Sequence, residues 1–150
     1  MTPGPVAPTT IIASHPGTDF DGLASMVAAQ KLHPDAVCVT QGRMDSNVTE
    51  FLSLYGDLFK LVRAKDVDFT AVRHLITVDI NRPARLGSLS TLAAREDVAI
   101  TVYDHHPKHE TQAEFGPRAT IQHRAYGSGT SALVEFLKDA NIPISPVEAT

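Results

Sequence analysis

The sequence predicts a three-layer α/β fold, in which a mostly parallel sheet of about five strands carries helices on both faces. Short apolar runs, typical of strands that are buried on both sides, alternate with longer segments of helical pattern. Proline, glycine or small polar residues mark the boundaries between them. Because strands that alternate with helices are joined by right-handed crossovers, they pair in parallel. A chain of 150 residues has the size of one ordinary domain.

Apolar runs give the predicted strands, at residues 10–14, 36–40, 73–80, 98–103 and 119–122. The last of these runs is short and is expected near an edge of the sheet. Residues 59–62 are a candidate for one more short strand. Prolines and small residues at the start make residues 1–9 an expected disordered lead-in.

Helices are predicted at residues 21–32, from residue 46 onward, at 88–95 and at 131–141. The first ends near His33, because Pro34 disfavours helical geometry in the residue before it. Capping residues precede the second, and Pro83 suits the first position of a short helix. Residues 108–117 are polar and are expected to form a loop. Residues 147–150 resemble the first turn of a further helix that is cut off.

The composition argues against several classes of protein. The net charge of −4 gives no reason for the whole domain to capture nucleic acid electrostatically, although a local basic groove stays open. The single cysteine, Cys38, lies in an apolar run and is expected to be a buried, inert thiol. No apolar run approaches the ~20 residues that cross a membrane, and the N-terminus lacks the pattern of a secretion signal. We therefore expect a cytoplasmic protein without membrane contact.

Ligand-type side chains follow three of the predicted strands, at the point where each strand ends. In open α/β sheets, ligands bind outside the carboxyl ends of the strands, where neighbouring strand ends meet. We therefore expect one shared site from the imidazoles and carboxylates that follow residues 10–14, 73–78 and 98–103: His15, Asp19, Asp21, Asp79, Asp104, His105 and His106.

This set of side chains points to bound cations. Several ionised aspartates in one cleft would raise one another's pKa values unless cations were present. A mixed shell of carboxylates and imidazoles suits Mn²⁺ or Mg²⁺ better than Ca²⁺, which prefers oxygen ligands. Two such ions could share Asp79 as a bridge, an arrangement that activates water and clamps the oxygens of a phosphoryl transfer.

Each of these residues also has an ordinary structural interpretation. Asp21 stands where a helix N-cap would, Asp19 suits a turn, and Asp79 is placed to cap the helix after Pro83. Asp104 could cap the turn after its strand, and His15 could be a simple loop histidine. Their combination at strand ends, rather than any one residue, favours the metal site.

A glycine-hydroxyl turn, Gly127-Ser128-Gly129-Thr130, precedes the last predicted helix. The free N–H groups at such a helix start can bind a phosphate. It lacks the lysine of a P-loop, however, and an ordinary capped helix start explains it equally well.

These motifs, in this order and spacing, resemble the DHH phosphoesterase superfamily. The motifs are His15-x-x-x-Asp19-x-Asp21, then Val78-Asp79, then Asp104-His105-His106, then the glycine-hydroxyl turn. The resemblance implies a Rossmann-like DHH N-terminal domain over residues 10–150. Residues 19–37 look more narrowly like the N-terminal DHH module of bacterial poly(A) polymerase and tRNA nucleotidyltransferase-like proteins, in which CBS and nucleotidyltransferase domains follow. The chain would then be a fragment, truncated at its C-terminal end.

The resemblance also implies a role for each site residue. His15 and Asp19 would hold one ion, Asp21 and His105 the other, and Asp79 would bridge them. Asp104 would orient the site, and His106 would face the scissile phosphate. Because consecutive residues of extended chain point to opposite sides, we expect His105 and His106 to separate in this way.

Two departures from the superfamily pattern affect these expectations. Pro16-Gly17-Thr18 stands where members often have an asparagine, and a further aspartate ligand is expected only beyond Thr150. The two Mn²⁺ or Mg²⁺ ions are therefore expected to bind incompletely in this fragment, which should show little catalysis of its own.

Two hypotheses of function follow. The first is a metal-dependent phosphoesterase module that hydrolyses a phosphodiester or phosphoanhydride in an RNA end, an oligonucleotide or a nucleotide. The alternative is a nucleotide- or metal-binding regulatory module of the same longer protein, with little turnover. A purely structural domain is disfavoured, because so many ligand-type residues are in place. The sequence does not distinguish among the substrates.

Overall fold

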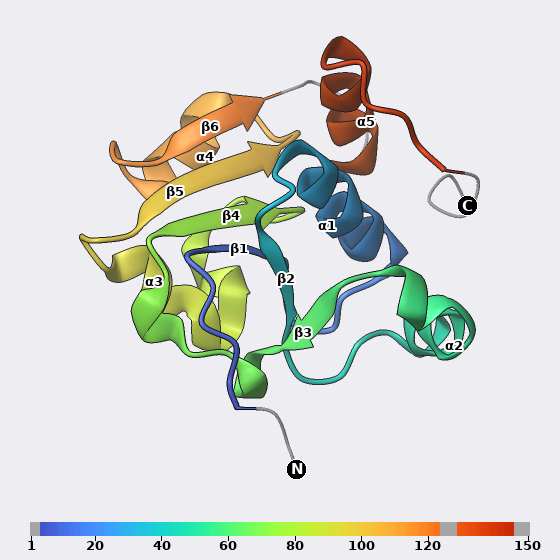
Figure 1. Ribbon diagram of the computed structural model, residues 1–150. Helices are drawn as coiled ribbons and strands as arrows, with labels where there is room; N and C mark the ends of the chain where they lie inside the picture. Colours follow the sequence, from blue (N-terminus) through green and yellow to red (C-terminus); the bar gives the residue numbers. More distant parts are fainter. Residues whose placement is uncertain (1–3, 124–128, 146–150) are drawn as a thin grey trace.

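A computed structural model describes residues 4–123 and 129–145, and its sheet is parallel throughout (Figure 1). Six strands lie in the order β3-β2-β1-β4-β5-β6. Their bounds are β1 (Thr10–Ala13), β2 (Val37–Thr40), β3 (Leu61–Arg63), β4 (His74–Val78), β5 (Ala99–Asp104) and β6 (Thr120–His123). The predicted α/β fold is confirmed, and the short segment near residues 59–62 adds the edge strand β3.

Helices cover both faces of the sheet, as predicted. The α-helices are α1 (Phe20–Leu32), α2 (Ser46–Tyr55), α3 (Ser90–Ala94), α4 (Lys108–Phe115) and α5 (Gly129–Asp139), and a 3₁₀ segment, η4 (Pro83–Leu89), precedes α3. Successive strand residues face opposite cores. Ile12 and Ile76 pack with Met26 of α1 and Leu133 of α5 on one side, whereas Leu75 packs on the other side with residues of η4, α3 and α4.

Helix α4 corrects the prediction of a loop at residues 108–117. Its residues are polar but are mostly good helix formers, and Gly116 ends it with a φ of 86°. Thr111 and Phe115, one turn apart, are its buried residues. Two buried positions are too few to produce the apolar periodicity from which helices were predicted.

The N-terminal segment also differs from expectation where the structure describes it. Val6 forms a β-bridge with Val67, through a bond from the Val6 amide to the Asp66 carbonyl and one from the Asp68 amide to the Val6 carbonyl. Residues 4–9, expected to be disordered, thus run beside the segment that follows β3. The helix expected at residues 147–150 lies outside the described residues.

The order of the strands changes direction between β1 and β4. From β1 the chain moves outward to β2 and β3, whereas β4 to β6 extend the sheet on the opposite side. Such a reversal opens a crevice between the carboxyl ends of the two central strands, which is where α/β proteins of this kind bind ligands.

The single cysteine has the predicted environment. Cys38 is fully buried in the core beneath α1, and burial raises the pKa of its thiol to about 12. Within the described residues, no helix is long and apolar enough to span a bilayer.

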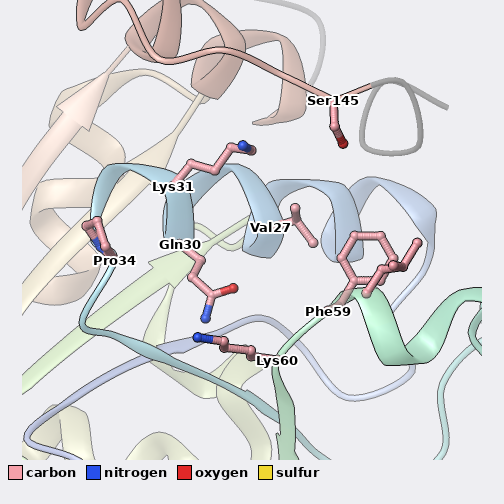
Figure 2. A pocket seen from close by; sticks show the side chains of 8 residues that line it. Val27, Gln30, Lys31, Pro34, Phe59, Lys60 and Ser145 are labelled. Carbon is pink, nitrogen blue, oxygen red and sulfur yellow. The ribbon is translucent and has the colours of Figure 1, made fainter.

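A hollow of about 400 Å³ lies between the outer side of α1 and the start of β3 (Figure 2). Val27, Gln30 and Lys31 contribute from α1, and Phe59 and Lys60 from the segment before β3.

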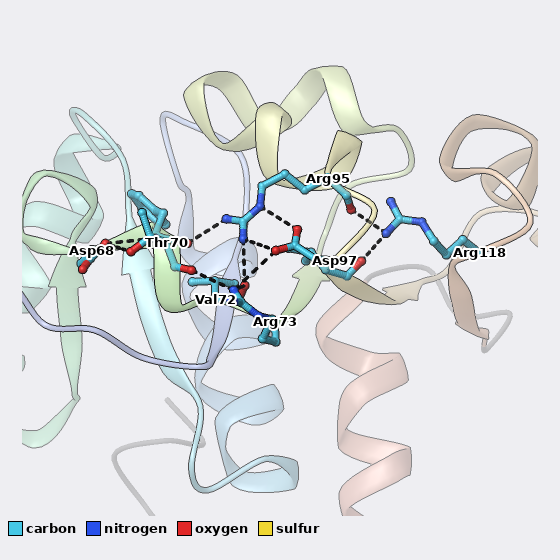
Figure 3. Close-up of polar contacts among 9 residues, drawn as sticks. Asp68, Thr70, Val72, Arg73, Arg95, Asp97 and Arg118 are labelled. Atoms are coloured by element: carbon cyan, nitrogen blue, oxygen red, sulfur yellow. Dashed lines mark hydrogen bonds and ion pairs between the residues drawn. The ribbon is translucent and has the colours of Figure 1, made fainter.

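An arginine network joins elements around the amino end of β5 (Figure 3). The Arg95 guanidinium donates to the carbonyl oxygens of Phe69 and Val72 and pairs with Asp97 at 2.8 Å. Arg118, which precedes β6, donates to the Arg95 carbonyl at 2.6 Å. These charges satisfy backbone carbonyls and hold together the segments before β4, β5 and β6.

Two histidines near the amino ends of the central strands predict a loss of stability in acid. His33 Nε2 lies 2.8 Å from the Tyr103 hydroxyl, and His74 Nε2 lies 2.8 Å from Thr101 Oγ1. Burial lowers the pKa of both imidazoles, and the neighbouring His74 lowers that of His33 further. Below pH ~6.5 the unfolded chain therefore binds more protons than the folded protein. The contribution of the two neutral histidines to the free energy of unfolding is complete above that pH and is lost as the pH falls.

Thermal unfolding at pH 7.5 and pH 5.5 would measure this loss. His74→Gln keeps a polar partner for Thr101. Between pH 7.5 and pH 5.5 we expect the unfolding midpoint of this variant to fall less than that of the wild type. The exposed His109 of α4 gives the control His109→Gln. Equal pH dependence in His74→Gln and the wild type would contradict the prediction.

Candidate metal centre

Three of the predicted ligands meet at the crevice between β1 and β4. His15 follows β1, Asp19 is the N-cap of α1, and Asp79 follows β4. One ligand atom from each of these three side chains lies within 4.8 Å of the others. Parallel pairing of Ala13 with Thr77 brings the two strand ends together, which explains why residues so distant in sequence converge.

Asp19 rather than Asp21 caps α1. Asp19 Oδ1 accepts a hydrogen bond of 2.9 Å from the Gly22 amide, and its backbone is extended, as an N-cap requires. The capping interpretation of Asp21 is therefore wrong, and Asp21 lies in the first turn of the helix. Asp19 combines a capping role with a place in the ligand cluster.

The hydrogen bonds of His15 direct one ring nitrogen toward the cluster. His15 Nδ1 lies 2.9 Å from the Pro16 carbonyl, which can only accept, so Nδ1 carries the proton in the neutral ring. The Nε2 lone pair then faces Asp79 Oδ2 at 3.3 Å. A lone pair and an ionised carboxylate need a proton or a cation between them, and a backbone carbonyl behind the second nitrogen is typical of metal-binding histidines.

Asp79 occupies a costly position. Its φ of 58° is in the left-handed region, which non-glycine residues seldom adopt. Burial, a hydrogen bond that the protonated Asp79 carboxyl donates to Asp21, and the charges of Asp21 and Asp19 raise the pKa of Asp79 to about 7, against a smaller lowering by His15. A divalent cation would offset the repulsion among these crowded carboxylates, so the residues present fit such an ion.

Asp21 links this cluster to helix α5. Its Oδ1 accepts a bond of 2.5 Å from Thr130 Oγ1 and a longer one of 3.4 Å from the Thr130 amide. Thr130 also lies 3.1 Å from Ser25 Oγ. Part of the α5 start that was expected to bind phosphate therefore contacts Asp21 instead. Gly127 and Ser128 lie outside the described residues, so the rest of that turn stays a prediction.

The Asp104-His105-His106 group lies one strand further along the same edge. Val78 pairs with Tyr103, so Asp79 and Asp104 leave neighbouring strands at the same level. Ligand atoms of Asp104, His105 and His106 lie within 4.8 Å of one another. Asp104 is almost completely buried, and its Oδ1 accepts a bond of 2.7 Å from His106 Nδ1.

The expected separation of His105 and His106 to opposite sides is wrong. Their ring centroids are 4.4 Å apart with 33° between the planes. The alternation rule applies within a strand, and β5 ends at Asp104, so the two histidines follow the bend beyond it. His105 Nδ1 is buried without a hydrogen-bond partner among the described residues, which again suits a missing ligand such as a cation.

Thr111 is a site residue that the sequence did not reveal. It is fully buried in α4, and its hydroxyl donates to Asp104 Oδ2 at 2.5 Å. With His106 on its other oxygen, Asp104 is held from two sides. Because residues 108–117 were expected to form a loop, no signal singled out this threonine. Asp104 accepts these bonds rather than capping the turn after its strand.

Gly87 supports the position of His15 and gives a testable prediction. Its φ of 62° suits glycine, and an added Cβ would lie 2.7 Å from Pro16 Cγ, next to His15. We expect Gly87→Ala to cost about 1–3 kcal/mol of stability and to weaken Mn²⁺ binding by moving the Pro16 loop. Thermal unfolding and Mn²⁺ titration would measure both effects.

Gly42→Ala is the matched control for Gly87→Ala. Gly42 has a φ of 57°, but nothing lies within 4 Å of its added Cβ. It should therefore lose stability through backbone strain alone and keep its Mn²⁺ affinity. Equal Mn²⁺ affinities in the two variants would show that Gly87 does not position the loop.

The fold and the site together define a class of protein. It is an α/β protein with carboxylates and imidazoles gathered where the strand order of a parallel sheet changes direction. Residues 9–149 match the DHH family, N-terminal domain. The chain belongs to the DHH family, which is part of a phosphoesterase superfamily.

Curated relatives place this domain in a longer context. The chain is 36% identical over 141 residues to the A-adding tRNA nucleotidyltransferase of Geobacter sulfurreducens. It is 29% identical over 146 residues to the protein of the same name from Aquifex aeolicus. These alignments cover 93% and 97% of this chain but 16% of each relative. The chain thus spans about a sixth of the length of the curated relatives it matches.

A solved structure supports the fold. An exopolyphosphatase-related protein from Bacteroides fragilis matches with a TM-score of 0.59 at 15% identity, over 87% of this chain and 39% of that one. At this identity the likeness concerns the fold alone.

Proposed function

We propose that this chain is a divalent-metal-dependent phosphoesterase module of a longer protein related to tRNA nucleotidyltransferases. The observation that carries the proposal is the cluster of His15, Asp19 and Asp79, with Asp21 against Asp79. Crowding carboxylates and imidazoles between β1 and β4, where the strand order changes direction, does not stabilise the fold by itself. They suit a cation of the Mn²⁺ or Mg²⁺ type.

Each residue of the cluster has a distinct part in this proposal. His15 and Asp19 would hold one ion, Asp21 and His105 would hold a second, and Asp79 would be available to both. When bound, such ions supply an activated water and neutralise the charge of the phosphoryl group. Asp21 Oδ1 accepts the Thr130 hydroxyl, so Oδ2 is the oxygen of Asp21 that would take this part.

His106 is the residue proposed to meet the substrate phosphate. Its Nδ1 donates to Asp104, so the opposite nitrogen, Nε2, can donate to a phosphate oxygen or to the leaving group when the ring is charged. The buried Asp104 accepts from Nδ1 and so fixes the orientation of the ring. Thr111 in turn fixes Asp104.

The context of the relatives suggests the substrate class. They are named for adding A to tRNA, so an RNA end, an oligonucleotide or a nucleotide is the proposed substrate. CBS and nucleotidyltransferase domains are the proposed neighbours in the same longer protein. A further aspartate ligand is proposed to follow Thr150.

Mn²⁺-stimulated hydrolysis is the direct test. The longer protein should cleave short RNAs, cyclic dinucleotides or pyrophosphate in the presence of Mn²⁺, and the 150-residue chain should do so weakly. Absence of cleavage of all three by the longer protein would contradict the proposal. Equal Mn²⁺ affinity in the chain and in a version extended by ~30 residues would contradict the further ligand.

A second candidate is a nucleotide- or metal-binding regulatory module with little turnover. The contact between Asp21 and Thr130 favours it, because one carboxylate oxygen of this aspartate is occupied by α5. Calorimetry of the longer protein with Mn²⁺ and adenine nucleotides would show binding without hydrolysis. Failure of both to bind would exclude this candidate.

A further inference from the structure

An exposed aromatic surface begins at the candidate metal centre. It consists of Phe20, Phe51, Tyr55 and Phe59, which we call the aromatic surface. Phe51 is its centre: its ring centroid lies 5.6 Å from that of Phe20, 5.0 Å from Tyr55 and 6.0 Å from Phe59. Three of the six phenylalanines and one of the three tyrosines of the chain gather here.

This surface is open to solvent. Phe20 is 46% exposed and Tyr55 is 43% exposed, and both belong to the small set of large apolar side chains that the described residues leave exposed. Burying a phenylalanine side chain completely contributes about 1.5–3 kcal/mol, so leaving nearly half of each of these two residues exposed forgoes part of that stabilisation. Clustered exposure of this kind usually marks a binding surface.

The surface adjoins the candidate metal centre in the sequence at one end. Phe20 stands between Asp19, a member of the ligand cluster, and Asp21, which contacts Asp79. From there the rings lead to Phe59, which also lines the hollow beside α1 (Figure 2). From Phe20 to Lys31 at the hollow, α1 advances about 16 Å, the length of roughly five stacked nucleotides at ~3.4 Å each.

The charge at the other end is complementary to a phosphate backbone. The charged side chains among the described residues that line the hollow are Lys31 and Lys60, and none of these lining residues is acidic. Lys60 is exposed, and Lys31 also donates to the Pro143 carbonyl at 3.0 Å. In a chain with a net charge of −4, a hollow whose charged lining residues, among those described, are lysines favours an anion.

We propose that the aromatic surface and this hollow bind the bases and phosphates of a short single-stranded oligonucleotide whose end lies in the metal centre. The bases stack on Phe20, Tyr55 and their neighbours, and the backbone passes Lys60. Aromatic platforms with adjacent cations bind single strands of any sequence in this manner. The inference rests on the proposed function, since it names the part of the substrate that lies outside the metal centre.

The test is binding without turnover. Fluorescence anisotropy with a labelled five-residue oligoadenylate, in a chelator and at two salt concentrations, measures affinity in the full chain. We expect Phe20→Leu and Tyr55→Leu each to weaken binding about tenfold, because leucine keeps apolar contact but lacks a π-face. Lys60→Gln should weaken binding several-fold and lower the salt slope by about 0.7.

Two matched variants are the controls. Leu54→Ala removes an exposed aliphatic side chain next to Tyr55, and Lys65→Gln removes an exposed lysine outside the hollow. Both should bind the oligonucleotide as the wild type does. Because all five substituted side chains are exposed, unfolding midpoints should change little, which confirms that the variants are folded.

Several results would overturn this inference. They are no oligoadenylate binding by the wild type, binding unchanged in the leucine variants, or pyrophosphate and adenosine monophosphate binding as tightly as the oligonucleotide. Sedimentation would detect a change of oligomeric state in Phe20→Ser and Tyr55→Ser. If these variants show one while the leucine variants bind the oligonucleotide normally, the surface is a protein–protein contact and the inference is wrong. If the wild-type protein binds the oligonucleotide but shows no Mn²⁺-dependent hydrolysis, the proposed function is contradicted, whereas the role of this surface in binding stands.

Discussion

Asp79→Asn is expected to lower Mn²⁺-dependent hydrolysis by about 1,000-fold, because it removes a carboxylate worth several kcal/mol of charge stabilisation in the transition state. Asparagine is the appropriate replacement, since it tolerates the left-handed backbone of this position, where φ is 58°. Mn²⁺ binding, measured by calorimetry on the longer protein, should be lost in the same variant.

The same substitution should stabilise the metal-free protein. Burial and the neighbouring Asp21 and Asp19 raise the pKa of Asp79 from 3.8 to about 7. Above that pH Asp79 is ionised in both states, but only the folded state holds the charge in a buried and crowded place, which lowers stability. The neutral amide removes this cost. We therefore expect a higher unfolding midpoint for Asp79→Asn at pH 8 in a chelator and no further rise when Mn²⁺ is added.

Asp57→Asn is the control for Asp79→Asn, because Asp57 is exposed in the turn after α2. It should change neither the midpoint nor the response to Mn²⁺. A variant at Asp79 that retains Mn²⁺ binding and turnover would show that the metal centre lies elsewhere.

His106→Ala should lower turnover by about 100-fold or more while leaving Mn²⁺ affinity close to that of the wild type. An oriented general acid contributes about 10²–10⁴-fold, and His106 is oriented by its bond to Asp104. Initial rates and Mn²⁺ titrations on the longer protein would separate the two effects. Asp104→Asn should reduce turnover as well, because an amide cannot stabilise the charged ring.

His109→Ala provides the comparison for His106→Ala, since His109 is an exposed histidine of α4 close by in sequence. It should behave as the wild type. If His106→Ala abolished Mn²⁺ binding, His106 would be a metal ligand. The structure makes this a specific alternative, because ligand atoms of His106, His105 and Asp104 lie within 4.8 Å of one another.

The fold was predictable because its strands are continuous apolar runs. Ile11 and Ile12 face opposite cores, so a strand buried on both sides is mostly apolar along its length, and the first ligand-type residue marks its end. The same logic located His15, Asp79 and Asp104. The convergence of His15, Asp19 and Asp79 followed from parallel pairing alone.

Other features depend on contacts that the sequence does not display. Helix α4 buries only Thr111 and Phe115 among its residues, so its polar sequence resembled a loop. The Thr111–Asp104 bond, and the bond from Thr130 to Asp21, join segments whose distance in space depends on helix placement. The stacking of His105 on His106 depends on a bend after the strand.

The change of direction between β1 and β4 has a mechanical consequence. One half of the sheet, β1 to β3, presents His15 and Asp19 from its first strand, whereas the other half, β4 to β6, presents Asp79. An ion held by both halves would cross-link two segments that lie far apart in the sequence, in addition to the backbone pairing of β1 with β4. Metal loading in this protein would then set how readily the two halves part.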